Sequence, residues 1–220
     1  GIAESFRGLK TNINTLLDQT GPKIITINSL IPGEGKSFIS SNLSAVISKT
    51  NKKVLLIGAD LHKPTLHNYL GIKESFGLVD YLKDEKKIED IINSTSIPNL
   101  FFIQTGLTTD NPSDLMDSKK FEKLIEKSRT MFDYVIIDNA PLLLVPDAIL
   151  ISQFADIVLF ILRINFSHKG QIKEINKIVE FNKIGLSAVV INSTPESGYA
   201  YGYGSRKKYW KKGYGEFKGK

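Results

Sequence analysis

Short apolar runs rich in Ile and Val recur along the chain, and amphipathic or polar stretches of helical length separate most of them. The runs lie at 24–28, 54–58, 100–104, 134–138, 157–162 and 188–191. They do not alternate polar with apolar residues, which is the pattern of strands covered on both faces. The sequence therefore predicts an α/β fold with a mostly parallel sheet flanked by helices.

Several helices begin at residues that favour helix starts. Asp117-Ser118 precedes the segment 119–129, Pro146-Asp147 precedes the segment that ends at Phe154, and Ser37 follows a glycine-rich turn. Short polar side chains cap the first N–H groups of a helix, and proline is tolerated in its first turn. These signals place helices between the predicted strands.

The pattern divides the chain into three parts. Residues 1–20 hold an amphipathic helix from Glu4 to Leu17, and 21–195 read as one domain, for which 220 residues with 41% hydrophobic composition suffice. The apolar residues on or near one face of this helix are Phe6, Leu9, Ile13, Leu16 and Leu17. From Pro195 the pattern changes to Gly, Tyr and Lys, so we expect residues 196–220 to form a flexible tail.

Composition narrows the possible functions. The absence of cysteine excludes disulfides, thiol catalysis and cysteine-ligated zinc, and the three histidines have no metal-ligand spacing.

No apolar stretch approaches the roughly 20 residues that cross a bilayer, so we expect a soluble polypeptide. Because it begins at Gly1 rather than Met, we also expect it to be a piece of a longer chain. The net charge of +6 comes mainly from the basic tail.

The segment Pro32-Gly33-Glu34-Gly35-Lys36-Ser37 carries the main chemical signal. A strand, a glycine-rich turn, a Lys-Ser pair and a helix build a cradle of backbone N–H groups that suits polyphosphate. We expect the N–H groups of Gly33 to Phe38 to wrap the phosphates of ATP or GTP, Lys36 to reach the β- and γ-phosphates, and Ser37 to bind Mg²⁺. The first glycine of the strict pattern is Leu30. A purely structural glycine-rich turn is therefore the alternative.

Two aspartates follow later strands. Asp60 comes after the run 54–58, and Asp138 ends the run 134–138. Ligands of open α/β sheets bind at the carboxyl ends of the strands, so both side chains should face the nucleotide loop. There they could hold Mg²⁺ and orient or deprotonate an attacking hydroxyl. The alternative is that each aspartate only caps the turn that follows it.

Asn192 follows the last predicted strand and is a candidate for reading the edge of the nucleotide base. Ordinary turn formation by the segment 192–195 is an equally simple interpretation.

Tyrosines are concentrated in the tail. Five of the eight tyrosines lie there: Tyr199, Tyr201, Tyr203, Tyr209 and Tyr214. Phosphorylation would add up to about two negative charges at each site and could reverse the charge of this basic segment. The alternatives are a low-complexity extension without a role and an aromatic-basic contact with nucleic acid.

Together these residues resemble the cytoplasmic kinase domain of the bacterial tyrosine autokinases, a P-loop NTPase family related in fold to the ParA and MinD ATPases. The resemblance covers nearly the whole chain. Residues 29–37 match the Walker A loop, 56–64 the Walker A′ strand and 134–141 the Walker B strand, and the tyrosine-rich tail completes the pattern.

The resemblance implies an ATP- and Mg²⁺-dependent protein-tyrosine autokinase that regulates exopolysaccharide or capsule synthesis and export. Lys36, Asp60 and Asp138 would be catalytic, and Ser37 would bind the metal with the two aspartates. In the family such domains form rings in which the tail of one subunit is phosphorylated in the site of the next. A transmembrane activator domain or partner, a cognate phosphatase and a place at the cytoplasmic side of the bacterial inner membrane are also implied. No nucleic acid is expected.

The first helix resembles the oligomerisation motif of the family through Glu4, Arg7 and Lys10. These residues are spaced i, i+3, i+6 and could make charged contacts with a neighbouring subunit. Helix solubility is the alternative explanation.

Several positions depart from the family pattern. Gly58 stands where the family usually has an aspartate, His62 and Lys10 replace arginines, and Ile31 replaces the additional loop lysine of ParA and MinD. Loss of a carboxylate near the metal could slow phosphoryl transfer while nucleotide binding persists. Two other functions therefore remain open: a ParA-like ATPase switch and a nucleotide-binding scaffold with weak or no kinase activity.

Overall fold

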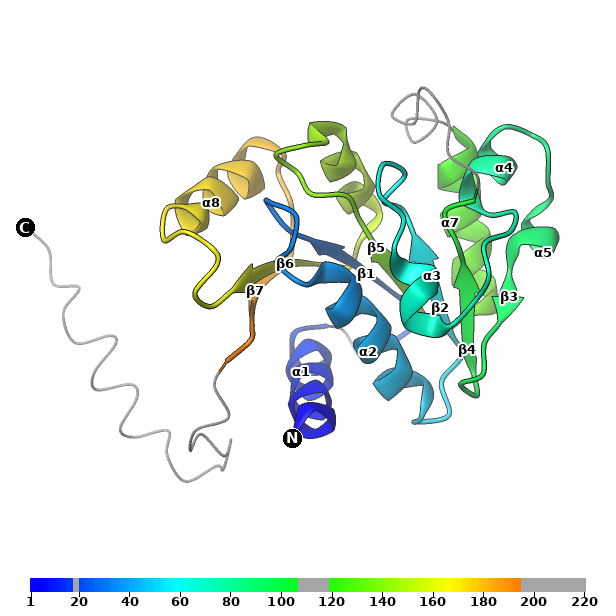
Figure 1. The fold of residues 1–220 in the computed structure, drawn as a ribbon, viewed down its shortest axis with the longest axis horizontal. Helices are drawn as coiled ribbons and strands as arrows, with labels where there is room; N and C mark the ends of the chain where they lie inside the picture. Colours follow the sequence, from blue (N-terminus) through cyan, green and yellow to red (C-terminus); the bar gives the residue numbers. More distant parts are fainter. Residues whose placement is uncertain (18–19, 107–118, 195–220) are drawn as a thin grey trace, which may run out of the picture.

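A seven-stranded sheet forms the centre of the protein in a computed structural model that describes residues 1–17, 20–106 and 119–194 (Figure 1). The strands are β1 (Lys23–Asn28), β2 (Val54–Gly58), β3 (Asn93–Ser94), β4 (Leu100–Ile103), β5 (Tyr134–Asp138), β6 (Ile157–Arg163) and β7 (Ser187–Asn192). Their order is β3-β4-β2-β5-β1-β6-β7. The pair β3–β4 is antiparallel and all other pairs are parallel, which confirms the predicted fold class.

Helices cover both faces of the sheet (Figure 1). They are α1 (Ile2–Leu16), α2 (Lys36–Ser48), α3 (Leu66–Leu70), α4 (Leu78–Leu82), α5 (Ile88–Ile91), α7 (Lys119–Met131), the 3₁₀-helix η1 (Pro146–Phe154) and α8 (Gln171–Phe181). Helices α1, α2 and α3 share a core with one face. Helices α4, α5 and α7 pack on the other face, and η1 and α8 extend that layer toward β6.

Strand β1 shows why the central runs are continuously apolar. Ile24 packs in the core beneath α7, while Ile25 and Ile27 pack in the core beneath α1 and α2. Successive side chains of a strand point to opposite faces, so a strand that is covered on both faces needs apolar residues at its odd and its even positions. Full burial of each such side chain contributes about 1.5–3 kcal/mol.

The sheet differs from the sequence expectation at its two edges. Strand β3 was not predicted, because Asn93 and Ser94 form no apolar run. Strand β7 is not covered on both faces as predicted, since the side chains of Val189 and Ile191 are 42% and 47% exposed. An edge strand has a neighbouring strand on one side only, and these two side chains stay partly open to solvent.

Two helices also differ in detail from the prediction. The segment from Pro146 to Phe154 is a 3₁₀-helix, whose three-residue turn stacks Ala148 and Ile151 on the buried side. In α1, Phe6 and Ile13 are buried, but Leu16 is 49% exposed and does not belong to the apolar face. Among the described residues, no helix is long and apolar enough to cross a membrane.

Candidate active site

The segment 29–37, called the phosphate loop below, joins the carboxyl end of β1 to α2. Gly33 and Gly35 have φ values of 88° and 98°, a left-handed conformation that glycine adopts without strain. In the part of the chain that the structure describes, the N–H groups of Gly35, Lys36, Ser37 and Phe38 have no hydrogen-bond acceptor. Free donors at the N-terminus of a helix form an anion site, so the loop is arranged for phosphate.

Asp138 lies beside this loop at the end of β5 and is 2% exposed. The Ser37 hydroxyl donates to its Oδ2 at 2.7 Å, whereas its buried Oδ1 has no partner among the described residues. Burial raises the pKa of Asp138 to about 6, although the positive charge of Lys36 and the hydrogen bond from Ser37 oppose the rise and the charge of Asp60 adds to it.

Ser37 and Asp138 fit a magnesium ion. Magnesium prefers hard oxygen ligands and is usually held by one or two carboxylates together with water and substrate phosphates. The buried Oδ1 of Asp138 is an oxygen acceptor without a donor, and the hydroxyl of Ser37 lies against the same carboxylate. No group of three His, Cys, Asp or Glu side chains that could hold a metal occurs in the described ranges, so a metal here would rely on the bound phosphates.

Asp60 follows β2 at the same edge of the sheet. Its Oδ1 accepts hydrogen bonds from the N–H groups of His62 at 3.2 Å and Lys63 at 3.0 Å, so it caps the following turn as the alternative interpretation proposed. Its charge nevertheless reaches Asp138 and raises the pKa of that residue. The fold thus brings Lys36, Asp60 and Asp138 together, although their catalytic and metal-binding roles stay predictions.

The other predicted nucleotide-binding residues lie in the phosphate loop or close to it. Pro32 and Gly33 are exposed, and the Phe38 ring packs edge-on against Phe6 at 5.8 Å between centroids. The Asn192 amide donates to the backbone oxygen of Glu34 at 3.0 Å, so in this structure it contacts the loop. A base-reading role for Asn192 remains a prediction.

The Glu34 side chain is fully buried and cannot face a nucleotide. Its Oε2 accepts from the N–H groups of Leu30 at 2.9 Å and Ile31 at 3.1 Å. Its Oε1 accepts from the Ser167 hydroxyl and from Gln171 Nε2, the latter at 3.1 Å. Only the main chain of Glu34 is therefore available to phosphates.

Sequence reasoning missed the residues that brace the loop, among them Ser167 and Gln171, and it missed Thr105. The Thr105 hydroxyl donates to the backbone oxygen of Gly58 at 3.2 Å and lies 3.2 Å from the point where a Cβ at Gly58 would stand. One signal was available for Thr105: like Asp60, it follows the carboxyl end of a parallel strand.

The predicted oligomerisation residues lie on α1. Glu4 and Arg7 form an ion pair with each other at 3.0 Å, and their side chains are 74% and 69% exposed. Such a pair fits helix solubility, and a role of Glu4, Arg7 and Lys10 in subunit contacts stays a prediction. The predicted phosphoacceptor tyrosines lie outside the described residues.

Comparisons with known proteins place this site in a family. A family model described as an AAA domain matches residues 22–188. The tyrosine-protein kinase ptk of Acinetobacter johnsonii is 37% identical over 201 residues, which cover 90% of this chain and 27% of that protein. The chain thus spans about a quarter of the length of this relative.

Two further matches cover most of both chains. The tyrosine-protein kinase YwqD of Bacillus subtilis strain 168 is 30% identical over 213 residues, 96% of this chain and 90% of that protein. The kinase domain of the Escherichia coli tyrosine kinase ETK superposes with a TM-score of 0.81 at 28% identity, covering 91% of this chain and 80% of that chain. A P-loop domain of this kind implies nucleotide binding. These similarities show that the chain belongs to the AAA domain family and, within it, to the bacterial tyrosine-protein kinases.

Proposed function

We propose that this chain is an ATP- and Mg²⁺-dependent tyrosine autokinase that phosphorylates its own C-terminal tyrosines in trans. The observation that carries the proposal is the buried, unpaired Oδ1 of Asp138 beside Ser37 and the free N–H groups of the phosphate loop. This arrangement supports the binding of a metal-complexed nucleoside triphosphate. The names of the relatives supply the reaction class.

In the proposed reaction the phenol oxygen of a tyrosine forms a bond to the γ-phosphorus of ATP as it loses its proton, and the bond from that phosphorus to the β–γ bridging oxygen breaks. Lys36 and the loop N–H groups stabilise the charge that passes to ADP. Asp60, which is more exposed than Asp138, accepts the phenol proton. Bound Mg²⁺ would neutralise phosphate charge, and Ser37 and Asp138 would hold it.

The first experiment incubates the protein with Mg-ATP and maps phosphotyrosine by mass spectrometry. The Lys36→Met variant should lose the label, because it lacks the cation that stabilises the phosphates. Lys49→Met at the exposed end of α2 is the matched control and should keep it. Full labelling of Lys36→Met would refute the kinase assignment.

Transfer in trans needs a second experiment. A donor with all five tail tyrosines changed to Phe is mixed with Lys36→Met as the acceptor. Phosphate on the acceptor tail shows transfer between chains, whereas an unlabelled acceptor beside a self-labelled wild type shows transfer within one chain.

A nucleotide-binding scaffold with weak or no kinase activity is the second candidate. The observation in its favour is Gly58, which stands directly across from Asp138 in the β2–β5 pairing and supplies no carboxylate to the site. ADP binding without phosphotyrosine would support this candidate. Turnover of ATP without phosphotyrosine would support a ParA-like ATPase switch instead.

The wider assignment rests on the family. The proposal therefore also includes a role in exopolysaccharide or capsule regulation and assembly into a ring. It further includes a transmembrane activator, a cognate phosphatase and a place at the inner membrane. Size measurement of the chain with and without its activator tests the ring.

A further inference from the structure

Two side chains from neighbouring strand ends contact the outer side of the phosphate loop. Arg163 ends β6 and Asn192 ends β7, and the two residues are register partners in that strand pair. An Arg163 guanidinium N–H donates to the backbone oxygen of Gly33 at 3.1 Å. The Asn192 amide donates to the backbone oxygen of Glu34 at 3.0 Å. We call Arg163 and Asn192 the outer clamp.

The outer clamp determines where two consecutive peptide units of the loop point. A trans peptide is planar, and its C=O and N–H point in opposite directions. When the carbonyls of Gly33 and Glu34 are held toward the clamp, the N–H groups of Glu34 and Gly35 must face away from it. Gly35 N–H is one of the donors that have no acceptor in the described part of the chain.

Close packing holds the clamp against the loop. A Cβ at Gly35 would lie 2.2 Å from Asn192 Nδ2, and a Cβ at Gly33 would lie 3.0 Å from the Phe166 ring. The Arg163 guanidinium lies over the same ring, 5.3 Å from its centre. Gly35 therefore permits the approach of Asn192 and Gly33 that of the Phe166 ring beneath Arg163, and both glycines also permit the left-handed backbone.

The buried Glu34 carboxylate holds the phosphate loop from inside. Ser167 and Gln171, which follow β6, donate to one of its oxygens, and two N–H groups of the loop donate to the other. Four donors satisfy this carboxylate, so the loop cannot turn without breaking several buried hydrogen bonds. The segment after β6 and the end of β7 thus form one wall of the loop.

We propose that Arg163 and Asn192 are positioning residues, which orient the N–H groups of the phosphate loop for the phosphates of the nucleotide. The proposal rests on the nucleotide-dependent function proposed above. Under this proposal Asn192 orients the loop backbone and does not recognise the base. It also gives Arg163 a role in phosphate binding that requires no contact with the phosphates.

The test measures how ADP, GDP and inorganic tripolyphosphate displace a fluorescent ADP analogue from the full chain. Arg163→Ala and Asn192→Ala should each weaken all three ligands by about tenfold, the effect of losing one good hydrogen bond that orients the binding groups. The preference for ADP over GDP should not change. Lys169→Ala, an exposed cation in the loop after β6, is the control and should bind as the wild type does.

Two additional readouts separate positioning from a general structural effect. The thermal midpoint of the unliganded protein should stay within about 2 °C of the wild type, because Arg163 is exposed and Asn192 lies at an edge strand. Arg163→Lys should recover part of the tripolyphosphate affinity, because a lysine ammonium can also donate to the carbonyl of Gly33.

Two results would overturn the proposal. One is wild-type affinity for tripolyphosphate in both alanine variants. The other is a loss confined to the ADP over GDP preference in Asn192→Ala, which would place that amide on the base. Phosphotyrosine is measured separately. If the wild type makes no phosphotyrosine while the two alanine variants still bind tripolyphosphate poorly, the kinase proposal is refuted and the positioning role of the outer clamp is supported.

Discussion

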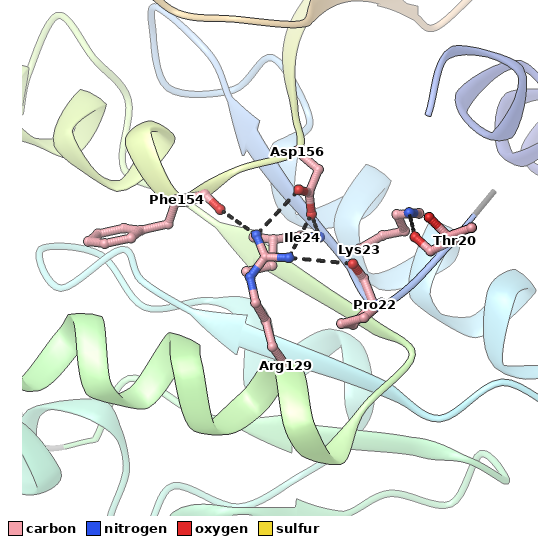
Figure 2. Close-up of polar contacts among 7 residues, drawn as sticks. All are labelled: Thr20, Pro22, Lys23, Ile24, Arg129, Phe154 and Asp156. Atoms are coloured by element: carbon pink, nitrogen blue, oxygen red, sulfur yellow. Dashed lines mark hydrogen bonds and ion pairs between the residues drawn. The ribbon is translucent and has the colours of Figure 1, made fainter. Parts of the chain in front are cut away.

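Two aspartates lie at opposite ends of the parallel strands, and their surroundings are opposite. We call the side of the sheet where these strands begin the amino edge and the side where they end the carboxyl edge. Asp156 precedes β6 at the amino edge, where both of its oxygens accept from Arg129 at 3.2 and 3.3 Å and Oδ2 also accepts from Ile24 N at 2.6 Å (Figure 2). Asp138 ends β5 at the carboxyl edge, deeper in the protein, where Ser37 donates to Oδ2 and the buried Oδ1 accepts no hydrogen bond from the described residues.

The difference separates a carboxylate that is hydrogen-bonded through both oxygens from one that keeps an unpaired oxygen. Asp156 joins β1, α7 and the end of η1, because the same Arg129 also donates to the backbone oxygens of Phe154 and Pro22. Both of its oxygens accept hydrogen bonds within the fold. Asp138 is held in a buried position where its charge is costly, and a cation bound beside it would lower that cost further than Lys36 and Ser37 do.

The largest expected effect comes from removing the charge at the carboxyl edge. Asp138→Asn should lower the rate of the proposed tyrosine phosphorylation on the order of a thousandfold, because the site would lose the carboxylate that we propose to hold Mg²⁺. Single-turnover measurement with saturating ATP checks this. A rate within a factor of ten of the wild type would show that Asp138 is not essential to the site.

The same substitution should stabilise the protein when no nucleotide is bound. Because burial raises the pKa of Asp138 from 3.8 to about 6, the folded state favours the protonated form. The contribution of Asp138 to the free energy of unfolding is therefore highest below about pH 4, and it falls by up to about 3 kcal/mol as the pH rises through 6. Denaturant unfolding at several pH values should show Asp138→Asn equal to the wild type near pH 4 and more stable above pH 6.5. An unchanging difference would contradict the buried charge.

At the amino edge the same kind of change should act on stability alone. Arg129→Met removes the partner of Asp156 and two hydrogen bonds to backbone oxygens, and it should cost roughly 1–2 kcal/mol because the pair is partly exposed. Nucleotide affinity should not change. Lys127→Met, which breaks the surface pair with Glu89, is the control and should cost at most about 0.5 kcal/mol. Weakened nucleotide binding in Arg129→Met would remove the contrast between the two edges.

The smallest effect is expected from adding a carboxylate to the site. Gly58→Asp places a second negative charge across from Asp138, which should raise the pKa of Asp138 further and lower the Mg²⁺ concentration needed for nucleotide binding by about threefold. Because a Cβ there would lie 3.2 Å from the Thr105 hydroxyl, the double variant with Thr105→Ala should show the larger gain. An unchanged Mg²⁺ titration in both variants would show that a carboxylate at this position does not reach the metal site.

Much of the fold could be predicted because local patterns carry it. The central strands are covered on both faces and appear in the sequence as uninterrupted apolar runs. Strand β3 and the exposed face of β7 escaped prediction, since edge strands follow no such rule. The 3₁₀ geometry of η1 depends on how Ala148 and Ile151 meet the sheet, which residue types alone do not specify.

The site divides in the same way. The sequence by itself determined the phosphate loop and placed Asp60 and Asp138 at its edge, because a strand, a glycine-rich turn and a helix are continuous in the chain and parallel strands end together. Only the tertiary structure decided that Glu34 turns inward, that Thr105 lies against Gly58, and that Arg163 and Asn192 hold the loop from outside. Arg163 and Asn192 are 130 and 158 residues from their partners in the loop, so folding alone brings them into contact.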